Sequence, residues 1–462
     1  MTSPAAATPR LKDELGALLN LAWPMMLAQG GIMLMSTVDT IVVGHDNATD
    51  MAGVALGAGV TNTIGVFGIG VAMGIEALVG QAHGAGEGRR ARSWMWQGLY
   101  VGLWVSAAMI AILAFAHRFF VSFGINPEMA RAASRFIDAR LVGVPAYAVM
   151  AGLRAYLSNT GRRWPIVLAV ASANVMNLCG DLILVRGWFG APKLGALGVG
   201  ISTTVSTIFM ATIMAFAVRA IAPTSGPSDE AEVIRKQDRE MMRRVFRIGW
   251  PVGMQAAVEN GVFMAAAWMI GTMGDRALSA HSIALTACSL TFMMVLGIAN
   301  AATARVGMHV GRGDSPAAGQ AGLLSIGLGA SFMAVTGGFF LSFPELAARV
   351  FTEDEAVIQA AIPLVRMAGV FALSDGIQGV SAGALRGIGE TDWPFWANLS
   401  AHWLIGFPLG IWLGTVRGMG PVGYWWGLSA GLTGVAITLA LRFYFATRRP
   451  LVRLEHSQPS SG

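Results

Sequence analysis

Carboxylates inside long apolar runs are the residues of this sequence most able to do chemistry. Asp39 lies late in the first run and Glu76 late in the second, while Glu259 and Asp375 lie deep in two later ones. An ionised carboxylate in an apolar interior is costly and is usually functional. Burial favours the neutral form, so these groups could take up protons, and a pair could equally hold Na⁺ or an organic cation. The residues alone leave these choices open.

Each carboxylate also has a structural interpretation. Asp39 stands a few residues before a predicted loop, so it could cap a helix end at an interface. Glu259 and Asp375 could each make a buried hydrogen bond without any further role. Glu76 could form a fold-stabilising pair with an arginine as readily as take part in transport.

Amide side chains accompany two of these carboxylates at helical spacing. Gln255 precedes Glu259 by four residues and Gln378 follows Asp375 by three, so each pair shares a helix face. This spacing favours one polar cavity lining, with hydrogen bonding between helices as the alternative. The predicted cavity residues are Gln29, Asn62, Gln255, Asn260 and Gln378.

Apolar segments must position all of these groups, because 54% of the 462 residues are hydrophobic and only 13% are charged. Soluble domains carry about 25% charged residues. About twelve apolar runs are each long enough to cross a membrane as a helix. The predicted spans are 16–43, 53–80, 95–121, 136–158, 164–185, 196–220, 248–271, 277–304, 317–342, 357–384, 394–415 and 421–446. The fold class is therefore all-α: a polytopic membrane protein with twelve transmembrane helices.

Lysine and arginine are concentrated in alternate loops, which places both termini in the cytoplasm. The first loop on the outer side, His45 to Asp50, contains acidic residues and no basic one. The net charge of +6 therefore reflects orientation in a lipid bilayer, and no nucleic-acid partner is expected. The N-terminal stretch lacks a cleavage site, so the first span itself is expected to direct insertion.

The two halves of the sequence repeat each other. Trp23-Pro24 recurs as Trp250-Pro251, about 227 residues later, and two further motifs recur at nearly the same offset. The halves therefore form two pseudo-symmetric six-helix lobes, related as parallel repeats. The predicted division is an N-terminal lobe at 1–221, a cytoplasmic linker at 222–247, a C-terminal lobe at 248–446 and a cytoplasmic tail at 447–462. The charged part of the linker is expected to be helical.

Several function classes lack their signatures. The sequence has no phosphate-binding Gly-x4-Gly-Lys-Ser/Thr loop, no nucleophile elbow and no zinc-protease helix. Its histidines show no metal-ligand spacing. We therefore expect neither an enzyme nor a bound cofactor.

Motifs along nearly the whole chain resemble the MATE (multidrug and toxic compound extrusion) transporters, in particular the NorM-like branch. They are Trp23-Pro24, Val38-Asp39-Thr40, Gly80-Gln81-Ala82-His83-Gly84-Ala85-Gly86, Ser279-Ala280-His281-Ser282-Ile283, Ala302-Thr303-Ala304-Arg305-Val306-Gly307, Ser374-Asp375-Gly376-Ile377-Gln378 and Gly383-Ala384-Leu385-Arg386-Gly387. Together these motifs are specific, whereas any one alone is weak.

The resemblance implies a secondary antiporter of the bacterial inner membrane that exports cationic or amphipathic compounds in exchange for Na⁺ or H⁺. It implies that Glu259 and Asp375 couple the cation, with a candidate Na⁺ site between them, and that Asp39 couples protons. Phe371, four residues before Asp375, departs from a tyrosine of some sodium-coupled relatives, which weakens the sodium assignment. A monomer is expected, because each chain contains a complete pathway.

Two other functions fit the same architecture less well. A flippase for lipid-linked sugars or polysaccharides would need more basic residues within its spans, where Arg154 is the clearest one. A receptor or membrane enzyme would not explain the duplication.

Overall fold

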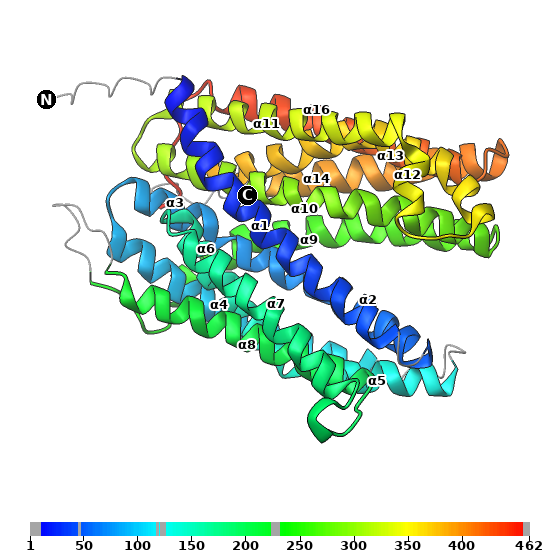
Figure 1. Ribbon diagram of the computed structural model, residues 1–462. Helices are drawn as coiled ribbons and strands as arrows, with labels where there is room; N and C mark the ends of the chain where they lie inside the picture. The colour runs from blue at the N-terminus through cyan, green and yellow to red at the C-terminus, as the bar shows by residue number, and fades with distance from the viewer. Residues whose placement is uncertain (1–10, 45–47, 117–119, 121–125, 223–231, 456–462) are drawn as a thin grey trace, which may run out of the picture. The chain divides into compact units, whose positions relative to one another are not determined.

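A computed structural model describes residues 11–44, 48–116, 120, 126–222 and 232–455, which lie almost entirely in helices (Figure 1). The expectations for the N-terminal segment 1–10, for residues 45–47 of the first loop, for linker residues 223–231 and for the end of the tail at 456–462 lie outside the described residues.

Eight α-helices come from the first half of the chain. They are α1 (Leu11–Gly44), α2 (Ala48–Met73), α3 (Ile75–Gly84), α4 (Gly88–Ala116), α5 (Pro127–Leu141), α6 (Gly143–Asn159), α7 (Trp164–Leu184) and α8 (Ala196–Ala220). The second half contributes α9 (Arg239–Gly271), α10 (Asp275–Gly311), α11 (Ser315–Ser342), α12 (Pro344–Arg349), α13 (Glu355–Ile388), α14 (Asp392–Asn398), α15 (Phe407–Ile411) and α16 (Pro421–Ala446).

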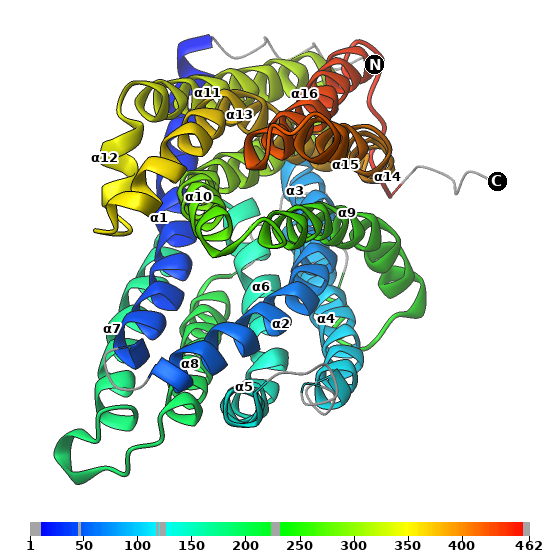
Figure 2. The ribbon, with the colours of Figure 1, turned by 90° about the vertical axis from the view of Figure 1, so that its right-hand side faces the viewer.

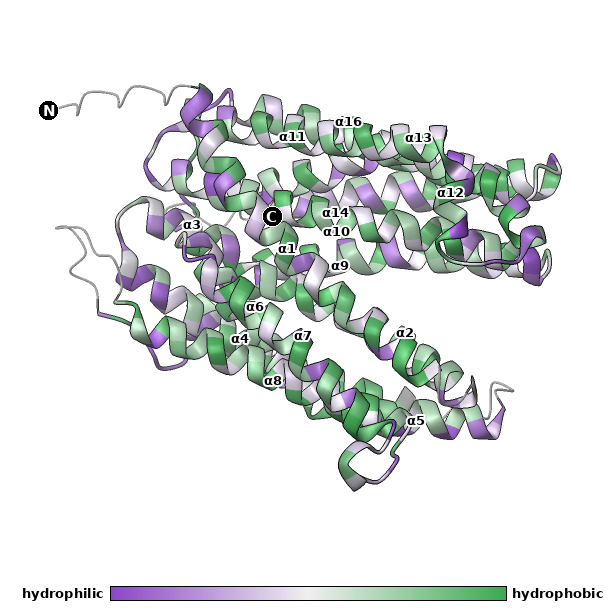
Figure 3. Cartoon of the chain, in the orientation of Figure 1, coloured by the Kyte–Doolittle hydropathy of each residue, from purple (hydrophilic) through white to green (hydrophobic). Residues whose placement is uncertain are grey.

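Ten helical segments of the described chain are long and apolar enough to cross a membrane. An eleventh is the pair α5 and α6, which is bent by 50° at a short break. The predicted span 136–158 is therefore the second part of a longer, bent element that begins at Pro127. The predicted span 248–271 lies in α9, where Gln255, Glu259 and Asn260 interrupt the apolar sequence and lower its hydropathy. Figure 3 shows hydrophobic residues along the helices and hydrophilic ones gathered near their ends.

The chain divides into two compact units. The N-terminal unit comprises residues 27–253, and the C-terminal unit comprises residues 1–26 with 254–462. The divisions fall inside α1 and α9, so the first turns of α1 pack with the second half of the chain. The predicted lobe and linker boundaries stay a prediction.

Within the N-terminal unit, α8 packs against α5, α6 and α7, and α2 packs against α5 (Figure 2). Its apolar core includes Val43, Leu113, Ala133, Ile137 and Val199, all fully buried. In the C-terminal unit, α13 lies at the centre and packs against α10, α11 and α16. Burial of these apolar faces against one another holds each unit together.

Helix ends show that the duplication extends to structure. Asn126 caps α5 by accepting a hydrogen bond from the Glu128 amide, and Asp354 caps α13 in the same way. Gly161 and Gly389 follow the corresponding helices with φ of 74° and 92°, a left-handed conformation that favours glycine. The same turn chemistry thus ends equivalent helices in both halves.

The linker is bound along α4. The Ser93 hydroxyl accepts a hydrogen bond from the amide of Ile234 (2.9 Å), and Gln97 Oε1 accepts one from the amide of Asp238 (2.9 Å). Residues 232–238 are not helical, because their backbone groups bond to these side chains instead. The expectation of a helical charged segment is therefore wrong for residues 232–238, and α9 begins at Arg239.

The same face of α4 also fixes the end of α8. The Arg92 guanidinium donates hydrogen bonds to the carbonyl groups of Val218 and Ile221, at the exposed carboxyl end of that helix. Neighbouring residues of α4 therefore hold both sides of the linker.

Candidate functional site

Asp39 is buried in the N-terminal unit, with 6% of its surface exposed. Asn177 Nδ2 on α7 donates to its Oδ1 at 2.9 Å, and the Thr203 hydroxyl on α8 lies 2.8 Å from its Oδ2. Because α1 continues to Gly44, Asp39 does not cap a helix end. Instead, its carboxyl group joins three helices.

The Thr203 hydroxyl can serve either protonation state of Asp39. It has one proton and lies 2.8 Å from both Asp39 Oδ2 and the carbonyl oxygen of Val199. With Asp39 ionised, the hydroxyl donates to the carboxylate; with Asp39 protonated, it accepts from the acid and donates to the carbonyl. The arrangement therefore accommodates a proton without moving a heavy atom.

Asp181, one turn after Asn177 on α7, brings a second carboxyl group to Asp39. It is completely buried, and neither of its oxygens has a hydrogen-bond partner that meets standard geometry in the described part of the chain. Two ionised carboxylates so close in a low dielectric repel each other, and a shared proton or a bound cation relieves that repulsion. Asp181 is not among the residues predicted from the sequence, although it lies within the predicted span 164–185 and meets the criterion that selected Asp39.

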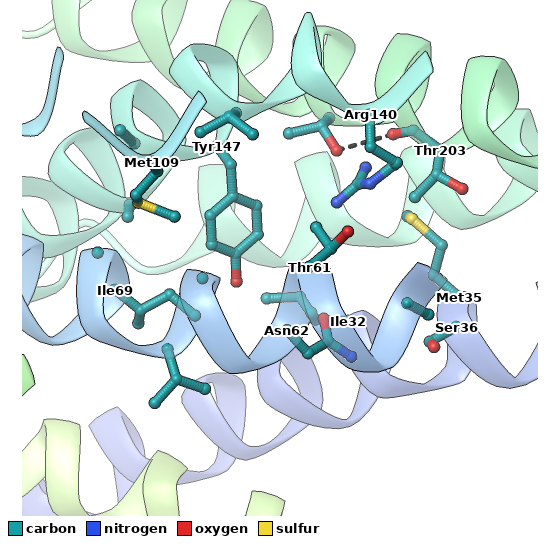
Figure 4. Close-up of a pocket in the computed structure, with 18 of the residues that line it drawn as sticks. Ile32, Met35, Ser36, Thr61, Asn62, Ile69, Met109, Arg140, Tyr147 and Thr203 are labelled. Atoms are coloured by element: carbon teal, nitrogen blue, oxygen red, sulfur yellow. Dashed lines mark hydrogen bonds between the residues drawn. The ribbon is translucent and has the colours of Figure 1, made fainter. Parts of the chain in front are cut away.

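A cavity of 210 Å³ adjoins this cluster and is lined only by residues of the N-terminal unit (Figure 4). Its wall is mainly apolar, with Met35, Met109 and Met210 among the lining residues. Asp39 and Arg140 are its charged residues. A ligand in this cavity would therefore lie against the carboxyl group that can take up a proton.

Glu259 and Asp375 lie together in the C-terminal unit. Gln378 Nε2 on α13 lies 3.5 Å from Glu259 Oε2 on α9, at the limit of a hydrogen bond. Asp375, one turn before Gln378, is 5% exposed and close enough to interact electrostatically with Glu259. The structure thus brings together three of the residues that the sequence singled out.

Aromatic side chains surround this second pair. Phe371 packs edge-on against Phe263 and Trp425, with ring centroids 5.9 and 5.8 Å away. The Trp425 indole donates to His281 Nδ1 at 3.1 Å. Phe371, at the position where some sodium-coupled relatives are expected to have a tyrosine, is therefore part of an apolar wall.

The remaining predicted residues are dispersed. Asn62 lines the cavity of the N-terminal unit, whereas Gln29 is not among its lining residues and accepts a hydrogen bond from Arg154. In the C-terminal unit, Gln255 is half-buried and Asn260 is exposed. Glu76 is buried in α3, with 2% of its surface exposed.

A further buried carboxylate, Glu14, was not anticipated, because it stands in the polar stretch before the first apolar run. Arg305 on α10 binds it through Nε at 2.9 Å and Nη2 at 2.5 Å. His309 Nε2 lies 3.2 Å from the same carboxylate. Both α10 residues and Glu14 belong to the C-terminal unit, so this ionic cluster anchors the first turns of α1 to α10.

No group of three or more His, Cys, Asp or Glu side chains is arranged to hold a metal ion in the ranges that the structure describes.

The chain matches the model of a known protein family. The MatE family model matches it twice, over residues 24–183 and 251–412. The two matches begin 227 residues apart, at positions 24 and 251, as the duplicated Trp-Pro motifs require.

Relatives are similar over nearly their full length. The multidrug resistance protein NorM of Burkholderia vietnamiensis is 32% identical over 97% of both chains. The multidrug resistance protein MdtK of Proteus mirabilis is 30% identical over 94% of this chain and 96% of its own. The crystal structure of the eukaryotic MATE transporter AtDTX14 has the same fold, with a TM-score of 0.85, 19% identity and coverage of 95% and 98%. On the family model, the full-length relatives and the duplicated helical fold, this chain belongs to the MATE family of membrane transporters.

Proposed function

We propose that this protein is a secondary antiporter that exports amphipathic, cationic compounds in exchange for protons, by alternating access. The observation that carries the proposal is the buried Asp39–Asp181 pair at the wall of an apolar cavity in the same unit. A cationic compound in the cavity is attracted by an ionised Asp39. A proton on Asp39 removes that attraction, so proton and compound compete for one site.

The partners of Asp39 favour a proton over Na⁺ at this position. Asn177 presents its amide nitrogen and Thr203 its hydroxyl to the carboxylate. The Asn177 amide nitrogen is a donor only, and the Thr203 hydroxyl is the one group of the two with a lone pair to offer a cation. A sodium site would need several oxygen atoms converging on one point, as hard cations do.

Glu259 and Asp375 provide a second site for a coupling ion or for the cationic group of the substrate. Asp375 interacts electrostatically with Glu259, and Gln378, one turn after Asp375, reaches Glu259; among the described residues no basic side chain contributes to the charge interactions of this pair. Neutralisation of this pair by an ion entering from the outer side would favour outward release of the compound. Measurement decides whether that ion is H⁺ or Na⁺.

The charge distribution and the bacterial relatives named as multidrug resistance proteins support the location that we propose. We place the protein in a bacterial inner membrane with both termini in the cytoplasm, the side on which basic loops remain. Because one chain contains the cavity and both carboxylate pairs, it works as a monomer.

Transport of ethidium into inside-out proteoliposomes, driven by imposed pH and sodium gradients in separate experiments, tests the proposal. A proton gradient alone is expected to drive uptake of the dye. A sodium gradient that drives uptake at uniform pH, with no response to a proton gradient, would overturn the proton assignment. Absence of transport with either gradient would overturn the antiport itself. Glu240→Gln, a change on the exposed first turn of α9, is a matched control.

Export of lipid-linked sugars is less well supported. A pyrophosphate group needs several basic side chains, and Arg140 is the basic residue that lines the cavity of the N-terminal unit. Arg154, the basic residue singled out from the sequence, binds Gln29 and is 8% exposed.

A further inference from the structure

Arg140 is a cationic side chain in the wall of the cavity, and the exchange of simple cations does not require it. It lies near the end of α5 and lines the cavity opposite residues of α2 (Figure 4). In Figure 4 its side chain extends into the cavity toward Thr61 and Asn62. A guanidinium ion in a cavity for cations repels the ligand, so its presence needs a separate reason.

Part of this guanidinium group is unsatisfied. Arg140 Nη1 is buried and has no hydrogen-bond partner within the described residues. Its charge interacts with that of Asp39, but both oxygens of Asp39 are already engaged by Asn177 and Thr203. A buried donor without a partner is destabilising, and an acceptor on a ligand in the cavity would satisfy it.

The surroundings of Arg140 define what that acceptor is. Tyr147 and Asn62 line the same cavity and add a hydroxyl and an amide that can donate to an anion. An arginine fork matches a carboxylate in two parallel hydrogen bonds. Asp39, on the same wall, offers a negative charge to a cationic group.

We infer that the cavity of the N-terminal unit selects amphipathic zwitterions, with Arg140 binding the carboxylate of the ligand and Asp39 its cationic group. The inference rests on the proposed antiport and adds the class of substrate. Protonation of Asp39 releases the cationic group, while Arg140 keeps its charge and its hold on the carboxylate. Zwitterions are therefore bound at two points and simple cations at one.

Two dyes that differ in a single group test this directly. Rhodamine 110 carries a free carboxylate, and rhodamine 123 is its methyl ester, with the same ring system and no negative charge. Proton-driven uptake into proteoliposomes and equilibrium binding to purified protein at constant pH are measured for both dyes. Arg140→Gln is compared with the unaltered protein and with Arg135→Gln, an exposed arginine on the same helix.

For each dye we measure the binding affinity and the uptake rate, and we take the ratio of the value for rhodamine 110 to that for rhodamine 123. Arg140→Gln is expected to lower both ratios at least tenfold. The variant should transport rhodamine 123 at least as fast as the unaltered protein does. Arg135→Gln leaves the ratio unchanged. Equal losses for both dyes would assign Arg140 a structural role and overturn the inference, as would an unchanged ratio. Should Arg140→Gln not fold, Arg140→Lys, which keeps the charge but not the fork, must lower the ratio severalfold. If an imposed proton gradient fails to drive uptake of rhodamine 123 by the unaltered protein, that result would instead count against the antiport.

Discussion

Two buried carboxylate sites in this protein have opposite surroundings. Glu14 is bound by the Arg305 guanidinium through two hydrogen bonds and approached by His309. Asp39 is bound by a neutral amide and a hydroxyl, and its charged neighbours include a second carboxyl group, Asp181. The first site has a permanent countercharge, whereas the second has an excess of acidic groups.

This difference separates structural carboxylates from coupling carboxylates. A carboxylate held by an arginine remains ionised and contributes a fixed contact. A carboxylate that faces another in an apolar surrounding changes its charge when a proton or cation binds. Glu259 and Asp375 resemble the second kind, because Gln378 is their polar neighbour and repulsion between them is unrelieved.

The largest expected effect is on stability at Glu14. Glu14→Gln leaves the Arg305 charge without its partner, and removal of one member of a buried ion pair costs about 3–5 kcal/mol. The thermal unfolding midpoint in detergent should fall markedly, while protein that stays folded keeps its proton coupling. Asp13→Asn, a change at the neighbouring exposed carboxylate, should leave the midpoint unchanged. A Glu14 variant of normal stability that has lost coupling would reverse the comparison.

At the pair Asp39 and Asp181 we expect the converse result: a loss of proton coupling with stability kept. Asp39→Asn and Asp181→Asn remove groups that can take up a proton, so proton-driven dye transport should fall by up to ~100-fold, within the range of measured coupling energies. Stability should change little, because each substitution also removes a repelling charge. Normal proton-driven transport by Asp181→Asn would show that Asp39 works without the pair.

A smaller loss is expected at the second pair. Glu259→Gln and Asp375→Asn should lower the initial rate of cationic dye efflux about 10-fold, as expected for loss of one charge interaction with the ligand or ion. Efflux from intact cells with matched expression measures this. Undiminished efflux in both variants would remove the pair from the mechanism and leave the N-terminal unit as the sole coupling site.

The smallest effect should come from the hydroxyl that serves both states of Asp39. Thr203→Val removes one hydrogen bond to the carboxyl group, worth roughly 1 kcal/mol, so the rate should fall about fivefold. The pH at half-maximal transport should shift as well, because the hydroxyl stabilises the ionised form more than the neutral one. Thr212→Val, an exposed position on the same helix, is the control. An unshifted pH profile would mean that Thr203 only supports the fold.

The duplication makes the difference between the halves sharper. Counted from the paired caps Asn126 and Asp354, Asp375 corresponds to Tyr147. Counted from the paired Trp-Pro motifs, Glu259 corresponds to Ile32. Tyr147 and Ile32 both line the cavity of the N-terminal unit. Equivalent positions thus hold carboxylates in one half and cavity-lining neutral side chains in the other.

Features with a local cause were predictable from the sequence. Hydrophobic runs predicted the helical membrane fold, and the shared helix face of Asp375 and Gln378 anticipated their position beside Glu259. Contacts between distant segments were not predictable. Asp181 meets Asp39 only after α1 and α7 pack together, and Glu14 is buried only because α10 covers a stretch that looks solvent-exposed in the sequence.

The binding of the linker to α4 has a consequence for chain topology. Arg92 holds the carbonyl group of Ile221, and Ser93, the next residue, holds the amide of Ile234. The two ends of the intervening chain are therefore held at adjacent residues of α4, so the chain between them has only a short gap to span. The entropy of such a loop changes only slowly with length, by about 0.6 kcal/mol for each doubling. Additional residues inserted between positions 223 and 231 would enlarge the loop and leave the start of α9 in register with α4.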